Sequence, residues 1–155
     1  MHEQKMQVLQ GTVSKLLRRG ATTNLKKALG KIHPADIAHL FRYFDPKDQQ
    51  RLIGLIPERD QASDVFSELE SDSQAKLAEL LEKDFLISLV QLMADDDSAE
   101  LLRGLPEELA EEILSALHRD QSEDVEQLLG YDEDTAGGIM STDVFALGQD
   151  MTVKQ

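Results

Sequence analysis

The residues best suited to chemistry in this sequence are acids. Asp95, Asp96 and Asp97 stand in a row, and Glu100 follows three residues later. If Asp96 or Asp97 is a helix N-cap, Glu100 lies in the first turn and shares a face with one of them. Helix capping and the helix dipole explain one or two such acids, but adjacent carboxylates repel one another. A hard divalent cation such as Mg²⁺ or Ca²⁺, which takes oxygen ligands, would relieve that repulsion, so capping and cation binding both stay open.

Other candidate sites carry weaker signals. Asp64 follows Ser63 near the start of an amphipathic segment, where a cap or first-turn position is the simpler interpretation. Residues 132–137 resemble the start of an EF-hand loop, but Ala136 and Asp143 occupy positions that need an oxygen ligand and a bidentate Glu. The four histidines show no ligand spacing, and no nucleophile–base arrangement or Gly-rich phosphate loop is present. We therefore expect no enzymatic activity.

The composition indicates a helical protein without thiol chemistry. Hydrophobic residues make up 41% of the 155 residues, and aromatic residues only 5%. Leu, Ala, Glu, Gln and Lys, all good helix formers, are abundant. The absence of Cys excludes disulfides and thiolate metal sites, and no apolar run approaches the roughly 20 residues of a membrane span. We expect a cytosolic protein.

The net charge of −14 is unevenly spread. Residues 1–31 carry seven Lys or Arg and one acid, a net charge of +6. Residues 58–155 carry six bases and 26 acids, a net charge of −20. Such an acidic surface repels nucleic acid phosphates and attracts cations or basic partners. Most of these carboxylates are expected to be ordinary solvated surface.

Amphipathic segments with helix start and stop signals follow one another along most of the chain. Val8, Val13, Leu16 and Leu17 give a first helix over 2–19 its apolar stripe, and Gly20 is suited to end it. Further helices are predicted over 25–32, 34–44, 47–56, 62–69, 72–81, 84–93, 97–105, 107–117 and 124–129. Caps are expected at Thr22 to Asn24 and at His33, and Asp45-Pro46 is expected to end one helix and start the next. A degenerate repeat begins near Asp36, Asp64, Asp97 and Asp124, which predicts an α-solenoid of helix pairs.

The chain changes character at Gly130. Gly137 and Gly138 predict a tight turn, Asp143 to Leu147 has the composition of a strand, and Asp150 is suited to cap a new helix. The predicted organisation is an N-terminal helix at 1–24, a superhelical domain at 25–130, and a junction at 131–155 that opens another domain.

Two stretches carry a family resemblance. Tyr131-Asp132-Glu133-Asp134-Thr135-Ala136-Gly137-Gly138-Ile139-Met140-Ser141-Thr142 is similar to the signature that joins the N domain to the first CBS domain in MgtE-type magnesium transporters. Upstream, Ile32 to Ala38 and Phe44 to Pro46 resemble the first repeat of that N domain, and Leu92 to Leu102 resembles its Asp-Asp-x-Ala-acid segment. The resemblance covers about residues 25–155.

The resemblance implies a fold, a location and a mechanism. The fold is all-α, a right-handed, armadillo-like superhelix of short helix pairs, similar to flagellar motor switch domains. The domain lies at the cytoplasmic face of the cell membrane, before a CBS pair and a homodimeric transmembrane pore. Because of the acidic surface described above, we expect no nucleic acid partner. Mg²⁺, which is both the transported and the regulatory ion, binds between the N and CBS domains and stabilises the closed pore.

The resemblance also implies a ligand set, carried over by motif to Asp64, Asp96, Asp97 and Glu100. Asp64 stands where the family more usually has Glu, which has a longer reach. The remaining ligands would come from the CBS domains. The alternative function is a helical protein-interaction module of the flagellar motor switch class, with no role in ion binding.

Overall fold

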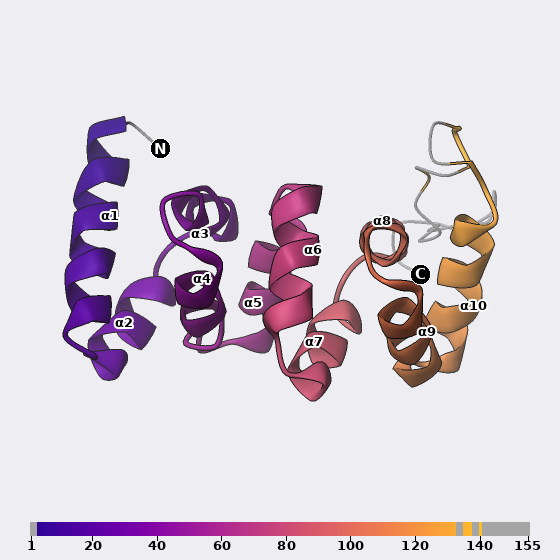
Figure 1. Ribbon diagram of the computed structural model, residues 1–155. Coiled ribbons are helices and arrows are strands. Elements are labelled where there is room, and N and C mark those ends of the chain that lie inside the picture. Colours follow the sequence, from indigo (N-terminus) through magenta and orange to yellow (C-terminus); the bar gives the residue numbers. More distant parts are fainter. Residues whose placement is uncertain (1–2, 133–134, 138–139, 141–155) are drawn as a thin grey trace, which may run out of the picture.

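Short helices follow one another through the computed structural model, which describes residues 3–132, 135–137 and 140 (Figure 1). Within these residues there are ten helices and no strand, which confirms the predicted all-α fold. The helices are α1 (Glu3–Arg18), α2 (Thr22–Leu29), α3 (Pro34–Phe41), α4 (Pro46–Ile53), α5 (Arg59–Ser67), α6 (Ser71–Leu80), α7 (Lys83–Val90), α8 (Asp95–Gly104), α9 (Glu107–Ala116) and α10 (Arg119–Leu129).

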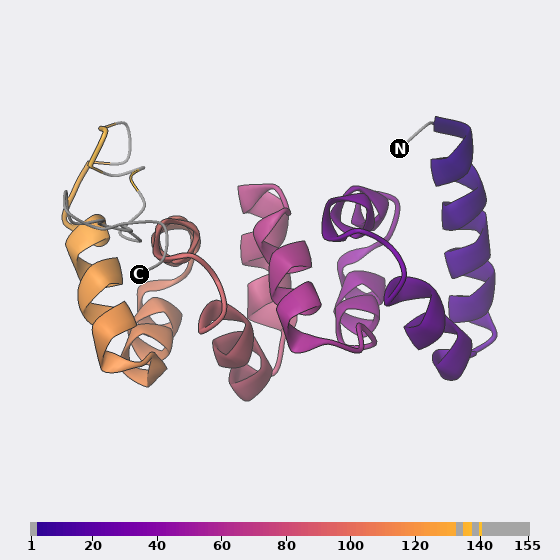
Figure 2. The same cartoon turned by 180° about the vertical axis from the view of Figure 1, so that it is seen from behind.

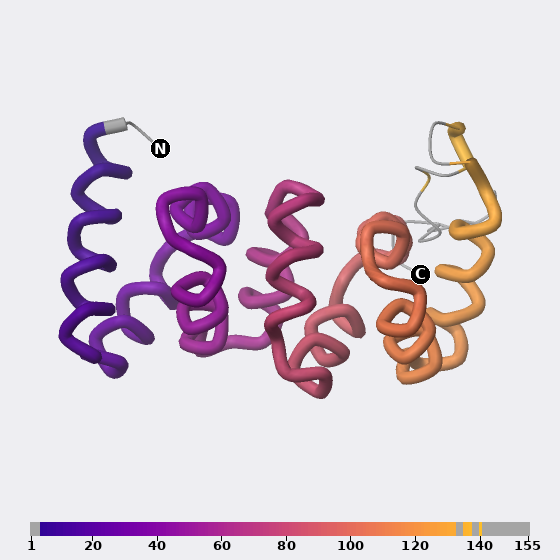
Figure 3. Tube along the Cα trace, viewed as in Figure 1, coloured from indigo at the N-terminus to yellow at the C-terminus, as the bar shows by residue number. Residues whose placement is uncertain are grey.

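From α3 onward the helices form two rows. The odd-numbered helices α3, α5, α7 and α9 each pack on the next odd-numbered helix, and α4, α6, α8 and α10 do the same. The result is an elongated stack with α1 at one end and α9 and α10 at the other (Figures 1 and 2). The trace in Figure 3 shows the chain alternating between the rows as it advances. This is the stacking of a superhelical solenoid, in which each unit contacts mainly its neighbours.

The repeat is shorter than the sequence analysis predicted. Helices of the odd row begin at 34, 59, 83 and 107, and those of the even row at 46, 71, 95 and 119, so successive starts are 24 or 25 residues apart. The predicted series of Asp36, Asp64, Asp97 and Asp124 was wrong as a single register. The first two lie on α3 and α5 in the odd row, whereas the last two lie on α8 and α10 in the even row.

A periodic acid marks the true repeat. Every helix from α3 to α10 has an acidic residue in its first turn, where the negative charge interacts favourably with the helix dipole. These acids recur every twelve residues, which is the length of one helix plus its linker: Asp36, Asp48, Asp60, Asp72, Asp84, Asp96, Glu108 and Asp120.

The core is one continuous apolar cluster that runs along the stack. Phe41 of α3 and Phe66 of α5 are its largest fully buried side chains and occupy matching places, 25 residues apart. Each unit buries its apolar face against the next, so the stability of one helix depends on its neighbours in the row.

Buried polar side chains bind the carbonyl groups at helix C-termini, which have no partner within their own helix. The side-chain amide of Gln49 donates to the carbonyl oxygens of Phe41 (2.8 Å) and Phe44 (3.0 Å). One repeat later, Gln74 donates to the carbonyl oxygen of Phe66 at 2.9 Å. In both cases donor and first acceptor are eight residues apart, so the bond joins an even-row helix to the end of the odd-row helix before it.

Several helix boundaries agree with the sequence signals. His33 accepts a hydrogen bond from the Ala35 N–H (3.4 Å), and Asp45 accepts one from the Asp48 N–H (2.9 Å), as caps of α3 and α4. Gly20 follows α1 with a φ of +64°, which favours glycine.

Other boundaries differ. The N-cap of α2 is Ala21, with no side-chain cap bond, and α10 begins at Arg119, five residues before the predicted start. On α1 the apolar face includes Met6 in place of Val8, which is 71% exposed.

The segment after α10 is anchored to the stack. The guanidinium group of Arg103 donates to the carbonyl oxygens of Leu128 (2.6 Å) and Tyr131 (3.3 Å). A Cβ atom at Gly137 would lie 2.8 Å from the Tyr131 ring, so the close contact between the backbone at residue 137 and this ring requires glycine. The predicted strand at 143–147 and helix start at Asp150 lie outside the described residues, and the predicted domain boundaries stay predictions.

Candidate functional site

The acidic cluster lies at the start of α8. Its N-cap is Ala94, which differs from the predicted N-cap at Asp96 or Asp97. Asp95, Asp96 and Asp97 therefore form the first turn, and no side chain caps the helix by a hydrogen bond. Asp96 belongs to the twelve-residue series of first-turn acids, so the helix dipole accounts for it. Asp95 and Asp97 are additional to that series.

Asp97 faces an open hollow of about 600 Å³ between α5 and the start of α8. Asp64, Ser67 and Glu68 line it from the second half and end of α5, and the loop before α8 contributes Leu92 to Ala94. His33, the cap of α3, and Pro34 complete the lining. Asp64 is thus neither a cap nor a first-turn residue, which corrects the simpler interpretation of its position.

The Asp97 carboxyl group is in an environment that disfavours its charge. Burial raises the pKa of Asp97 above its ordinary value of 3.8, and the nearby carboxylates of Asp96, Glu100 and Glu68 raise it further. A hydrogen bond from the Ser67 side chain opposes this shift. The site therefore holds its negative charges under mutual repulsion, and a bound cation would relieve it.

Two buried polar atoms near this turn lack a hydrogen-bond partner within the described structure. They are Oδ1 of Asp96 and Oγ of Ser98. A buried carboxylate oxygen without a donor is costly, because it has lost its contact with water and gained nothing in return. Of the two, only the Asp96 oxygen can act as a hard anionic ligand.

The structure brings the four predicted ligands together only in part. Asp64 and Asp97 line the same hollow. Asp96 and Glu100 act on Asp97 through their charges but are not among the residues that line the hollow. Glu100 instead accepts a hydrogen bond from the Ser71 hydroxyl at 2.6 Å, across the contact between α6 and α8.

Sequence reasoning missed Glu68. It follows Asp64 by four residues, the spacing that places two side chains on one side of a helix, so this signal was available in the sequence. Ser67 was also missed, and its role could not be found from spacing because it depends on how α5 meets α8.

The donor set fits a hard cation, although the side chains do not form a complete chelate. Carboxylate oxygens are the ligands that Mg²⁺ prefers, and the ion usually keeps several of its waters. Over the described ranges, no three His, Asp or Glu side chains come together closely enough to hold an ion by themselves.

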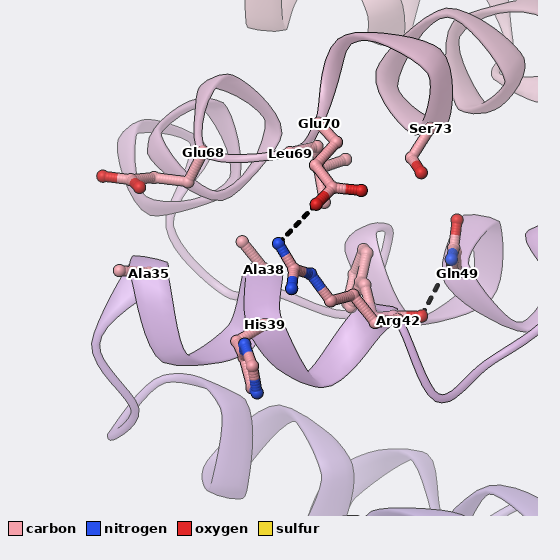
Figure 4. A pocket seen from close by; sticks show the side chains of 10 residues that line it. Ala35, Ala38, His39, Arg42, Gln49, Glu68, Leu69, Glu70 and Ser73 are labelled. Carbon is pink, nitrogen blue, oxygen red and sulfur yellow. Dashed lines mark hydrogen bonds and ion pairs between the residues drawn. The ribbon is translucent and has the colours of Figure 1, made fainter.

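A second, smaller cavity of about 190 Å³ lies beside this hollow, between α3, α4 and the α5–α6 linker (Figure 4). Arg42 and Glu70 form an ion pair across it at 2.5 Å. Glu68 lines both cavities, and in Figure 4 its carboxylate points away from the Arg42–Glu70 pair. Arg42 therefore pairs with the charge of Glu70 and not with that of Glu68.

Residues 32–134 match the family model of the MgtE intracellular N domain. The chain belongs to this family. The match begins just before α3 and includes α3 to α10, so it contains the whole two-row stack and the acidic hollow. The flagellar motor switch class, the alternative from the sequence, is not the family that matches.

Solved structures agree with the MgtE fold. One described as the cytosolic domain of the Mg²⁺ channel MgtE in complex with ATP is 27% identical, with a TM-score of 0.77 over 85% of this chain. Another, described as the soluble part of a magnesium transporter, is 21% identical, with a TM-score of 0.76 over 88% of this chain, and supports the fold alone. No curated protein matches this chain.

This chain spans about half of those solved proteins, since it covers 54% of each. Among the helices described in the structure, none has the length and hydropathy needed to cross a membrane.

Proposed function

We propose that this MgtE N domain is a Mg²⁺-sensing regulatory domain of a magnesium transporter, with no enzymatic activity. The observation that carries the proposal is the environment of Asp97, whose pKa is raised by burial and by the charges of three neighbouring carboxylates. A binding site for a divalent cation needs this concentration of negative charge.

Each acid has a role in the proposal. Asp97 is the central ligand, because it lines the hollow and is surrounded by the other charges. Asp96 offers a buried oxygen without a donor, and Asp64 and Glu68 face the hollow from α5. Glu100 raises the local negative potential and would become a ligand on leaving Ser71.

The remaining ligands would come from water and from a second surface. We assign that surface to CBS domains of the same protein, which the family signature at residues 131–142 leads into. Mg²⁺ typically takes only one or two carboxylates from one protein surface, so a shared site suits the ion. The isolated chain is then expected to bind Mg²⁺ weakly.

A shared site explains how an ion could regulate a pore. Mg²⁺ would favour the arrangement in which both domains supply ligands, and this population shift would stabilise a closed homodimeric transporter. When Mg²⁺ leaves, the repelling carboxylates would favour separation of the N domain. The domain would act at the cytoplasmic face of the cell membrane, attached to a transmembrane region.

Limited proteolysis of the full-length protein tests this proposal. Millimolar Mg²⁺ is expected to protect the N domain from cleavage, and combined Asp96→Ala and Asp97→Ala substitutions should remove most of that protection. The matched control combines Asp60→Ala and Asp72→Ala, which remove first-turn acids of the same series from α5 and α6. Equal protection of the wild type and the Asp96/Asp97 variant would refute the ligand assignment.

A further inference from the structure

The two ends of the stack carry opposite charge. Residues 1–31, which contain α1 and α2, have a net charge of +6. Residues 107–129, which contain α9 and α10, have eight acids and one Arg, a net charge of −7. These segments lie at opposite ends of the elongated molecule, so they cannot meet within one chain (Figures 1 and 2). Surfaces of such charge are complementary between two copies.

The outward face of α1 is built differently from its inward face. Met6, Val13 and Leu17 are buried against the stack. Four exposed residues of α1 follow one another at intervals of three or four residues, which places them along one side of the helix: Lys5, Val8, Thr12 and Lys15. Arg19, also exposed, continues this spacing directly after the end of α1.

Val8 and Gly11 indicate that this outward face makes a contact. Val8 is 71% exposed, so a large apolar side chain stands between the basic residues. Gly11 lies inside the helix, where glycine is unfavourable, yet a Cβ atom built there meets nothing within 4 Å. No neighbour within the described part of the chain therefore requires the glycine, whereas a second helix approaching closely would.

The acidic end offers a matching surface. An open groove of about 380 Å³ runs along α9, and its apolar lining comes from Leu102, Leu105, Ala110, Leu114 and Leu129. Glu107 and Glu111 lie one turn apart on its rim, and both are exposed. The groove thus combines an apolar floor with an acidic edge, the inverse of the basic and apolar outer face of α1.

We propose that the outer face of α1 in one copy docks into the groove along α9 of a second copy, head to tail. An amphipathic helix laid in an apolar groove is a recurrent mode of recognition. Val8 enters the apolar floor, and Lys5, Lys15 and Arg19 pair with the rim acids. The contact uses neither Asp97 nor its hollow, so it is independent of Mg²⁺ sensing.

The net charge of −14 on each copy does not prevent this contact. Charges on a protein surface are screened over about 8 Å at physiological salt, so the local charges of the ends dominate. Because the contact joins two different surfaces, it either closes a ring or adds further copies. The association should therefore increase with concentration and weaken at high salt.

Sedimentation velocity of the 155-residue chain tests the contact. At about 0.15 M NaCl, where surface charges are screened over about 8 Å, the wild type should associate as its concentration rises, and about 0.5 M NaCl should weaken this association. The basic-end variant combines Lys15→Glu and Arg19→Glu, and the groove variant combines Glu107→Lys and Glu111→Lys. Each should associate about tenfold more weakly than the wild type, since like charges then face each other. Val8→Asp should weaken association without changing helicity by circular dichroism.

Mixing the two charge-reversed variants provides the decisive arm. Acidic α1 then meets a basic rim and basic α1 meets an acidic rim, so the mixture should associate more strongly than either variant alone. The control carries Lys47→Glu and Lys76→Glu on exposed residues of α4 and α6, which change the net charge by the same amount as the basic-end variant. It should associate like the wild type. The proposal is overturned if the wild type stays monomeric, if the control loses association equally, or if the mixture fails to associate.

Discussion

The first turns of α6 and α8 occupy equivalent places in the even row, one repeat apart, but differ in two ways. The first turn of α6 has a single acid, Asp72, whereas that of α8 has three. Gln74 follows on α6 and binds the Phe66 carbonyl group; its counterpart on α8, 24 residues later, is Ser98, whose buried hydroxyl has no partner among the described residues. The other helices of the even row each have one first-turn acid and a side chain that donates to a carbonyl oxygen eight residues earlier, namely Gln49 on α4, Gln74 on α6 and Ser122 on α10. The first turn of α8 departs from this pattern where the candidate ligands cluster.

The comparison teaches which acids belong to the scaffold. A negative charge in each first turn is explained by the helix dipole and recurs in every helix from α3 to α10. The extra charge of Asp97 is disfavoured by burial and by the neighbouring carboxylates, and it lies near two buried polar atoms that have no partner among the described residues. The twelve-residue pattern of first-turn acids does not require it. Natural proteins accept such local costs mainly at functional sites.

Substitutions at Gln74 on α6 and at Ser98 on α8 are expected to show the largest difference between the two turns. Gln74→Ala should lower the free energy of unfolding by about 1–3 kcal/mol, because the buried bond from the Gln74 amide is lost and the Phe66 carbonyl oxygen keeps only backbone donors such as the Leu69 N–H at 3.3 Å. Ser98→Ala should change it little or raise it slightly, because this hydroxyl makes no bond to lose. Urea denaturation of the two variants measures the difference. A loss at Ser98 as large as that at Gln74 would show that the turns are equivalent.

A smaller effect is expected from neutralising Asp97. Its pKa is raised in the folded protein, so the folded state binds its proton more tightly than the unfolded state. The stability of the wild type relative to Asp97→Asn should therefore fall as the pH rises from 3.8 through the raised pKa, and stay constant above it.

Urea denaturation between about pH 4 and 7 measures this trend, with Asp72→Asn as the matched control in α6. Loss of the dipole interaction should make the control less stable than the wild type by a few tenths of a kcal/mol. A wild-type advantage over Asp97→Asn that grows with pH would contradict the electrostatic account.

The helices could largely be predicted from the sequence because their local signals are strong. His33 with Pro34, and Asp45 with Pro46, placed the starts of α3 and α4 to within one residue, whereas both helices end three residues before the predicted ends. The repeat register was missed because the search followed aspartates that precede apolar pairs. The first-turn acids with their twelve-residue period, such as Asp60 and Asp72, would have revealed it.

The candidate site was only partly predictable for a different reason. Asp97 stood out as one of three adjacent acids, and Glu68 could have been found from its spacing to Asp64. Three features depend on packing between repeats: the approach of α5 to α8, the hydrogen bond from Ser67 to Asp97, and the hydrogen bond from the Ser71 hydroxyl to Glu100. Such contacts join residues about 30 positions apart, beyond the reach of local patterns.

A titration of the 155-residue chain with Mg²⁺, followed by backbone amide NMR shifts at constant ionic strength, tests the central claim most directly. We predict saturable shifts at Asp64, Glu68 and residues 95–100, and none at the equivalent first turn of α6, residues 71–76. This result would assign the cation site to α8 even if binding is weak. Shifts of equal size in both turns, or none at Asp97, would contradict the account.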